Sequence, residues 1–273
     1  MMPYLIQKFG VYIAWLLGTS FFFLRYLFTA GIVFMVFYIW KSKKFYFRKI
    51  QSRYPQARQI YGELKHSLMT AGVFALLGVA LYFLRRNGYT SIYTRISDYG
   101  WGYLILSFVF MIFLHDAYFY WTHRFMHHPR LFPVFHKVHH LSHNPTPLAS
   151  FSFHPLEAVV EFGIVPLATL VMPLHPLVLL LLAFWSLVWN IVGHLGFELF
   201  PACFVRHPVF QWFNTSTHHN IHHQRSKCNY GLYFNLWDKI MHTNHPDYLN
   251  IFDTLQSKIT TNHEKASSSK ISL

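Results

Sequence analysis

Three short clusters of histidine are the residues of this chain best suited to chemistry. They read His123-Arg-Phe-Met-His127, His136-Lys-Val-His139-His140 and His219-Asn-Ile-His222-His223. On a helix, residues three and four apart lie on nearly the same face, so each cluster directs its imidazole rings one way. Core packing gives no reason to repeat this spacing three times. The pattern therefore predicts metal binding.

Almost all of the possible metal ligands in and near these clusters are histidines. Of the 20 histidines, 16 lie between His115 and His223, a window that holds only four carboxylates. Eight neutral nitrogen ligands exceed what one four-coordinate zinc ion uses, so the clusters predict two metal ions. Imidazole binds iron, zinc, copper and nickel alike, so ligand type alone does not identify the metal. The H-E-x-x-H motif of zinc proteases is missing, and a redox-active di-iron site fits best.

Three carboxylates are placed to assist such a site. Asp116 lies seven residues before His123 and eleven before His127, on one stripe of a continuing helix. We expect it to accept the free ring N–H of a ligand, and we predict it as a catalytic-site residue. Glu157 and Glu161 follow Pro155 at an expected helix start, where they either favour the helix dipole or orient ligands.

The composition places these clusters in a membrane protein. The chain is 53% hydrophobic and 12% charged, against about 25% charged in ordinary soluble domains. We predict an all-α, polytopic membrane protein with four to five membrane helices capped by a cytosolic, histidine-lined di-metal site. The segment Phe9–Leu24 is expected to lie in the membrane plane, with Arg25 at the interface. The apolar stretches are Tyr26–Trp40, Leu68–Leu84, Gly102–Trp121 and Leu156–Phe200, the last divided by Pro173 and Pro176.

The net charge of +13 agrees with membrane topology better than with nucleic-acid binding, which we exclude. Residues 41–66 carry eight Lys or Arg against Glu63 alone, so the positive-inside rule places them in the cytoplasm. One span out and one span back then bring the first two clusters to the cytoplasmic side. An apolar hairpin returns the third cluster to the same side.

We divide the chain into three regions. Residues 1–100 hold N-terminal membrane helices and the basic loop, 101–245 form the catalytic region, and 246–273 form a C-terminal tail, expected to be disordered from Lys258. The two cysteines, Cys203 and Cys228, are too few for a disulfide framework and are interpreted as structural.

The residues that flank the clusters also resemble those of a known family. The second cluster is followed by Asn144-Pro145-Thr146-Pro147-Leu148-Ala149-Ser150 and Phe153-His154-Pro155-Leu156-Glu157, and the third by Asn229-Tyr230-Gly231 and Leu236-Trp237-Asp238-Lys239. With the order of the clusters and the hairpin between them, this text resembles the fatty acid hydroxylase/sterol desaturase superfamily. Within that superfamily it is most similar to the C5-sterol desaturase branch. The resemblance runs from about His115 to His245.

The resemblance implies O2-dependent hydroxylation or desaturation of a sterol-like or fatty-acyl lipid by two iron ions. It implies electrons from an external carrier, either cytochrome b5-like or ferredoxin-like, and a site facing the cytoplasm of a bacterial inner membrane or of the endoplasmic reticulum. His194 stands where the superfamily often has a further histidine. A non-catalytic metal-binding membrane protein and a metal-dependent membrane hydrolase are the alternatives. The implied metal ligands are His123, His127, His136, His139, His140, His194, His219, His222 and His223.

Overall fold

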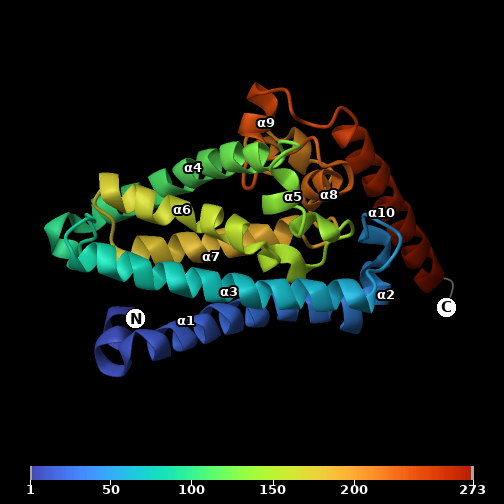
Figure 1. The fold of residues 1–273 in the computed structure, drawn as a ribbon. Helices are drawn as coiled ribbons and strands as arrows, with labels where there is room; N and C mark the ends of the chain where they lie inside the picture. Colours follow the sequence, from blue (N-terminus) through green and yellow to red (C-terminus); the bar gives the residue numbers. More distant parts are fainter. Residues whose placement is uncertain (1, 272–273) are drawn as a thin grey trace.

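The structure is a computed structural model that describes residues 2–271, and side chains as far as Asn262. These described residues form helices, turns and isolated bridges, with no β-strand. Long helices lie side by side along one axis, and short helices and loops gather at one end of them (Figure 1). The predicted all-α class is confirmed. Residues 1, 272 and 273, in the predicted N-terminal and C-terminal regions, lie outside the described residues.

In the described chain, four helical segments are long and apolar enough to cross a membrane. A further helix, α6, runs back along the bundle and forms a hairpin with α7, so the prediction of four to five membrane helices is confirmed (Figure 1). The four segments are α1 (Met2–Phe34) with its continuation η1 (Met35–Trp40), α3 (Ala57–Arg86), α4 (Gly100–Met126) and α7 (Pro176–Gly193); α6 spans Pro155–Val171.

Both helices of the hairpin begin at a proline, as the sequence predicts for α6. The ring nitrogens of His154 and His175, each just before its helix, accept the N–H of Leu156 and Leu177. A histidine cap followed by proline satisfies the exposed amides at a helix start and fixes where the helix begins. The α6 start thereby sets the position of Glu157 in the first turn.

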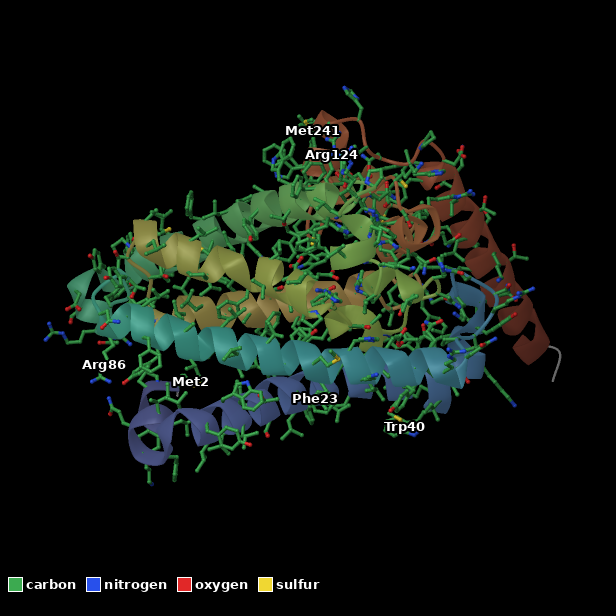
Figure 2. The ribbon with its side chains drawn as sticks, in the orientation of Figure 1. Met2, Phe23, Trp40, Arg86, Arg124 and Met241 are labelled. Carbon is green, nitrogen blue, oxygen red and sulfur yellow. The ribbon has the colours of Figure 1, made fainter. Side chains whose placement is uncertain are left out.

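The N-terminal segment departs from expectation. Apart from a break at Gly10 (φ +79°), α1 and η1 form one helical segment, so the division into an in-plane helix and a first span is wrong. Tyr26 stacks on Phe151, close to the start of α6, and donates to the carbonyl of Leu148. Figure 2 shows Met2 beside Arg86 at one end of the bundle, with the segment running to the far end.

Small residues let α1 approach its main neighbour, α3. Ala14 and Gly18 on α1, and Ala71 and Ala75 on α3, are spaced four residues apart and buried. Helices in lipid gain little from apolar burial against each other, because lipid tails are equally apolar. Close backbone contact through small residues therefore supplies much of their association.

The short elements form a cap at one end of the bundle. They are α2 (Ser42–Phe45), η2 (Tyr46–Arg48), α5 (Phe132–Phe135), η4 (His139–Leu141), η5 (Pro147–Phe151), η6 (Phe204–Arg206), η7 (Phe210–Trp212), α8 (Ser216–Arg225) and α9 (Leu236–Ile240). The cap brings the basic segment after η1 and all three histidine clusters to the same end, as the parity of the spans predicts (Figure 1). At the opposite end, the loop with η3 (Ile96–Asp98) bonds to the turn of the hairpin through Ser91 and Leu174.

The C-terminal region is helical rather than disordered. Helix α10 (Tyr248–Ile271) includes most of the segment after Lys258 that was expected to lack structure. Its buried residues Tyr248, Phe252, Leu255 and Ile259 recur on one face of the helix. Ser and Thr content suggested disorder, but this apolar stripe anchors the helix on the cap.

The close contact between α1 and α3 makes a testable prediction. At Gly18, an added Cβ would lie 3.3 Å from the Cβ of Ala75, so Gly18→Leu should force the helices apart. We expect a loss of about 1–3 kcal/mol, typical of overpacking, measured by thermal unfolding in detergent. The matched control is Gly31→Leu on the same helix, where a Cβ meets only Leu27 of its own turn. Equal losses in both variants would contradict the packing argument.

Candidate metal centre

The cap gathers nine buried or half-buried histidines into two groups. In each group the nearest ring nitrogens lie within 4.8 Å of one another. The five-histidine group comprises His123, His127, His136, His140 and His222, and the four-histidine group comprises His139, His194, His219 and His223. Every histidine predicted as a ligand, including His194, belongs to one of these two groups. Whether these groups bind metal stays a prediction.

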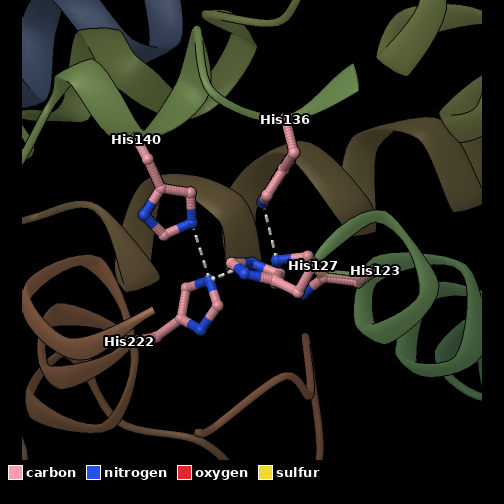
Figure 3. Close-up of side chains that lie close together, drawn as sticks. All are labelled: His123, His127, His136, His140 and His222. Atoms are coloured by element: carbon pink, nitrogen blue, oxygen red, sulfur yellow. Dashed lines mark hydrogen bonds between the residues drawn. The ribbon is translucent and has the colours of Figure 1, made fainter. Parts of the chain in front are cut away.

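The five-histidine group joins three parts of the chain. His123 lies near the end of α4, His127 directly follows it, and His222 belongs to α8 (Figure 3). The Nε2 atoms of His123 and His136 are 2.9 Å apart. The Nε2 atom of His222 lies 3.2 Å from that of His127 and 3.1 Å from that of His140. The rings therefore meet through the same nitrogen.

The four-histidine group is centred on His194, directly after α7. Its Nε2 atom lies 3.1 Å from the Nε2 atoms of His139, His219 and His223. His219 and His223 stand one turn apart on α8, and their Nε2 atoms are 3.2 Å apart. The close approach of α7 and α8 favours Gly193, because a Cβ there would lie 3.2 Å from the His219 ring, tighter than usual contact.

Acceptors behind the rings fix which nitrogen faces inward. The Nδ1 atoms of His123, His222 and His194 lie 2.7–2.8 Å from the backbone carbonyls of Tyr230, Cys228 and Asn190. A carbonyl only accepts, so each of these Nδ1 atoms carries the proton and each Nε2 atom presents a lone pair. Lone pairs facing each other at about 3 Å repel unless a cation lies between them.

Burial keeps these rings neutral. It lowers the pKa of His194 and His222 to about 4. Burial, followed by the neighbouring imidazoles, lowers the pKa of His136 and His223 well below the usual range. Neutral imidazole is the form that binds a metal, so the rings are available as ligands at physiological pH.

The donor set fits two metal ions. Metal–imidazole bonds of about 2.1 Å meeting at right angles place neighbouring nitrogens about 3.0 Å apart. The observed separations of 2.9–3.2 Å between Nε2 atoms match that spacing in both groups. The nine imidazoles are therefore arranged as two adjacent groups at the spacing of metal ligands.

The carboxylate that contacts a candidate ligand is Glu157, and the expectation for Asp116 is wrong. Glu157 Oε1 lies 2.7 Å from the Nδ1 atom of His136, which resolves its open role in favour of orienting a ring. Asp116 Oδ1 instead accepts the backbone N–H groups of Tyr233 and Phe234. Asp116 is buried, as its position on one helix face with His123 predicted. Its Oδ1 atom, however, accepts hydrogen bonds from the backbone of a later loop and not from a histidine ring.

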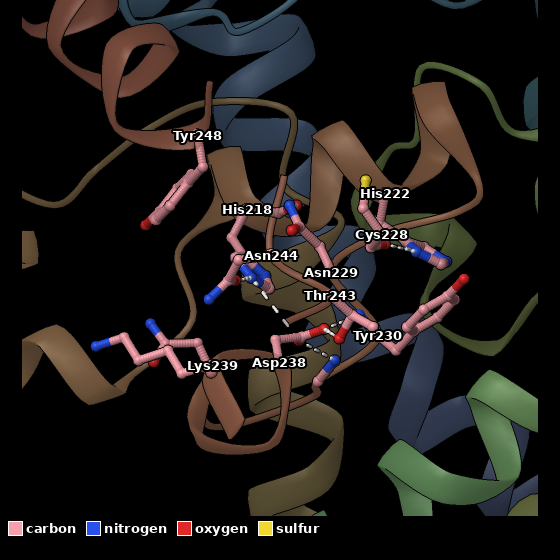
Figure 4. Close-up of polar contacts among 12 residues, drawn as sticks. His218, His222, Cys228, Asn229, Tyr230, Asp238, Lys239, Thr243, Asn244 and Tyr248 are labelled. Carbon is pink, nitrogen blue, oxygen red and sulfur yellow. Dashed lines mark hydrogen bonds and ion pairs between the residues drawn. The ribbon is translucent and has the colours of Figure 1, made fainter. Parts of the chain in front are cut away.

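Asp238 and Asn229 are positioning residues that the sequence reasoning missed. Asp238 accepts the N–H groups of Tyr230 and Gly231 and the hydroxyl of Thr243 (Figure 4). Asn229 adopts a left-handed conformation (φ +57°) and donates to the carbonyl of His218. Together they hold the segment whose carbonyls orient His123 and His222. In the sequence, the only indication of these two residues was their position in the family-like segments that follow the third cluster.

Comparison with known proteins agrees with this site. A family model described as fatty acid hydroxylase matches residues 108–243, which include every histidine of both groups. Lathosterol oxidase of Rattus norvegicus is 35% identical over 192 residues, or 69% of this chain and 62% of the relative. Lathosterol oxidase of Homo sapiens is 32% identical over 204 residues, or 73% and 66%.

A fungal relative extends the match. The Delta(7)-sterol 5(6)-desaturase of Saccharomyces cerevisiae is 30% identical over 230 residues, or 83% of this chain and 58% of that protein. The chain thus spans less than two thirds of the length of these relatives. No solved structure matches the chain significantly.

The role of Asp238 is testable through metal content. In Asp238→Ala, the Tyr230 segment loses its anchor and His123 its fixed acceptor, so the five-histidine group should hold metal more weakly. We expect metal per chain to fall toward half, measured by elemental analysis of purified protein. Asp253→Ala, which removes an exposed ion pair with Arg206, is the matched control and should keep its metal. Unchanged metal content in Asp238→Ala would refute the positioning role.

Proposed function

Because the chain belongs to the fatty acid hydroxylase/sterol desaturase superfamily, we propose that it is an integral-membrane oxidoreductase with two iron ions. It uses O2 to desaturate a C–C bond of a sterol-like lipid or to hydroxylate one of its C–H bonds. The observation that carries this proposal is the pair of adjacent groups of five and four neutral imidazoles at metal-ligand spacing. The similarity to lathosterol oxidases and Delta(7)-sterol 5(6)-desaturases supports a sterol over a fatty acyl chain.

We assign one metal ion to each histidine group. The five-histidine group would hold one iron and the four-histidine group the other. Bound iron supplies the ability to reduce O2 and remove hydrogen from an unactivated carbon. The chain contributes uncharged ligands whose inward nitrogens are fixed, and Glu157 keeps the proton of His136 on Nδ1. Burial of the histidine groups would limit the access of bulk water to the metal ions that they would hold.

The overall reaction requires an external reductant. In desaturation, the lipid loses two hydrogens, and O2, two electrons and two protons complete the formation of two water molecules. Hydroxylation uses the same electrons and protons and places one oxygen atom in the lipid. We propose that a separate carrier, cytochrome b5-like or ferredoxin-like, delivers these electrons one at a time.

We propose that the cap faces the cytoplasm. The basic residues after η1 lie at the cap end of the bundle, and such residues favour the cytoplasmic side. Lys43, Lys44 and Arg53 are charges that an acidic carrier or anionic lipid headgroups would contact. Contact with either partner would place the cap at the membrane surface, where a soluble electron carrier can reach it.

The di-iron proposal predicts both metal content and oxygen use. Purified protein should hold about two irons per chain and consume O2 only when lipid and reductant are present. His222→Ala should lower iron content and abolish turnover, because His222 contacts two other rings of its group. His128→Ala is the matched control, since His128 is exposed beside the first cluster and outside both groups. Iron analysis and lipid mass spectrometry provide the readout.

Three outcomes would contradict the proposal. Zinc alone after iron-replete expression would count against an oxidoreductase. Turnover without O2 would indicate a hydrolase. A cellular role that survives His222→Ala and His223→Ala together would indicate a non-catalytic metal-binding protein.

A further inference from the structure

The loop that follows the second histidine cluster is bonded to the N-terminal region of the chain. This loop, residues 142–148, lies beside the start of α3 at the cap end of the bundle (Figure 1). Gln59 of α3 donates to the carbonyl of Asn144, and Tyr26 of α1 donates to the carbonyl of Leu148. Both donors lie outside the segment that the fatty acid hydroxylase model matches. Support for the second cluster therefore comes from the membrane helices that precede the matched segment.

The central contact in this region is made by Glu63, a buried carboxylate of α3. Its Oε1 atom accepts from the Gln59 amide at 2.8 Å and from the Ser142 hydroxyl at 2.9 Å. Its Oε2 atom accepts from the Thr146 hydroxyl at 2.5 Å. Among the described residues, Glu63 has no ion-pair partner. Since a buried carboxylate without a cation is costly, its hydrogen bonds to the loop must compensate for its burial.

Packing does not hold η4 against α3 on this side of the cap. A cavity of about 420 Å³ lies between the two elements, and its lining includes Glu63 of α3, Leu141 of η4 and Ser152. The carbonyl of Ser152 lies 3.3 Å from the Nδ1 atom of His139. The hydrogen bonds of Glu63 therefore cross a gap that side chains leave open beside the second cluster.

The position of η4 affects both histidine groups. His139 and His140 are adjacent in η4, yet their Nε2 atoms lie 3.1 Å from those of His194 and His222, which belong to different groups. Ser142, which donates its hydroxyl to Glu63, also donates its backbone N–H to the carbonyl of His139. A displacement of η4 would therefore move one ligand of each group at once.

We propose that Glu63 is a positioning residue of the metal centre, which holds η4 so that His139 and His140 reach different metal ions. This inference rests on the two-metal part of the proposed function. The Glu63 carboxylate bonds to the hydroxyls of Ser142 and Thr146 and to no histidine ring, so it acts through the loop. Asp238, by contrast, supports the segment that orients rings of the five-histidine group alone.

Hydrogen exchange tests the contact in metal-free, full-length protein. In Glu63→Ala, the amides of residues 139–148 should exchange about tenfold faster, the effect of losing hydrogen bonds to a charged group, as measured by mass spectrometry. The matched control is Thr70→Val, two turns further along α3. Thr70 is buried, and its hydroxyl has no hydrogen-bond partner in the described part of the chain, so this variant should exchange like the wild type.

Metal retention tests the positioning role. Iron-loaded Glu63→Ala should lose metal to EDTA about tenfold faster than the wild type, with no half-loaded plateau, because one ligand of each group is displaced. Asp238→Ala should lose the metal of one group first. Glu63→Gln keeps one oxygen acceptor and should lose metal at an intermediate rate, a readout that remains if Glu63→Ala fails to fold.

A spectroscopic readout separates positioning from folding. Fully loaded with cobalt(II), Glu63→Gln should show shifted visible absorption bands, because these bands follow the geometry of the ligands. Thr70→Val should keep the wild-type spectrum. A role of Glu63 in folding alone would leave the bands of the loaded variant unchanged, and that result would contradict the proposal.

Two further results would overturn the inference. One is that Glu63→Ala and Thr70→Val do not differ in hydrogen exchange or in metal loss. The other is a half-loaded plateau in Glu63→Ala, which would confine its effect to one group. Failure of the proposed function looks different: the wild-type protein would take up no metal, while the difference in exchange between the two variants would remain.

Discussion

The convergence of uncharged imidazole nitrogens in the cap is the interaction on which the rest of the structure depends. Nine rings lie in two groups with their inward nitrogens about 3 Å apart, an arrangement that is repulsive without cations. The protein enforces this arrangement with acceptors placed behind the rings. Backbone carbonyls and one carboxylate hold the Nδ1 protons, and burial keeps the rings from becoming charged. The first turn of α6, the last turn of α7 and the segment between α8 and α9 supply those acceptors.

Two of these acceptors are carbonyls of irregular backbone. Cys228 and Tyr230 lie in a segment between α8 and α9 that contains a left-handed residue and no regular helix. A helix would use its carbonyls internally, so a segment that offers them to side chains must be stabilised in another way. Asp238 does this by accepting two of its amides, and Asp116 does the same for the amides of Tyr233 and Phe234.

The sequence predicted the fold class and all nine histidines of the site, because helical spacing and long apolar stretches are local signals. It did not predict how the histidines divide between two groups, since that depends on how α4, α7 and α8 pack. The role of Asp116 was misjudged because a stripe on one helix does not indicate which distant backbone will meet it. Glu157 had an open role until His136 was placed beside it. Backbone acceptors such as the Tyr230 carbonyl have no residue signature at all.

The histidine clusters of the sequence are not the groups of the structure. The second cluster sends His136 and His140 to one group and His139 to the other, and α8 likewise divides His222 from His219 and His223. During synthesis, which proceeds from the N-terminus, neither group can be completed before α8 has left the ribosome. By then every long apolar helix has already been made. The long apolar helices can therefore insert before the centre is loaded, and a truncated chain that lacks α8 would lack ligands of both groups.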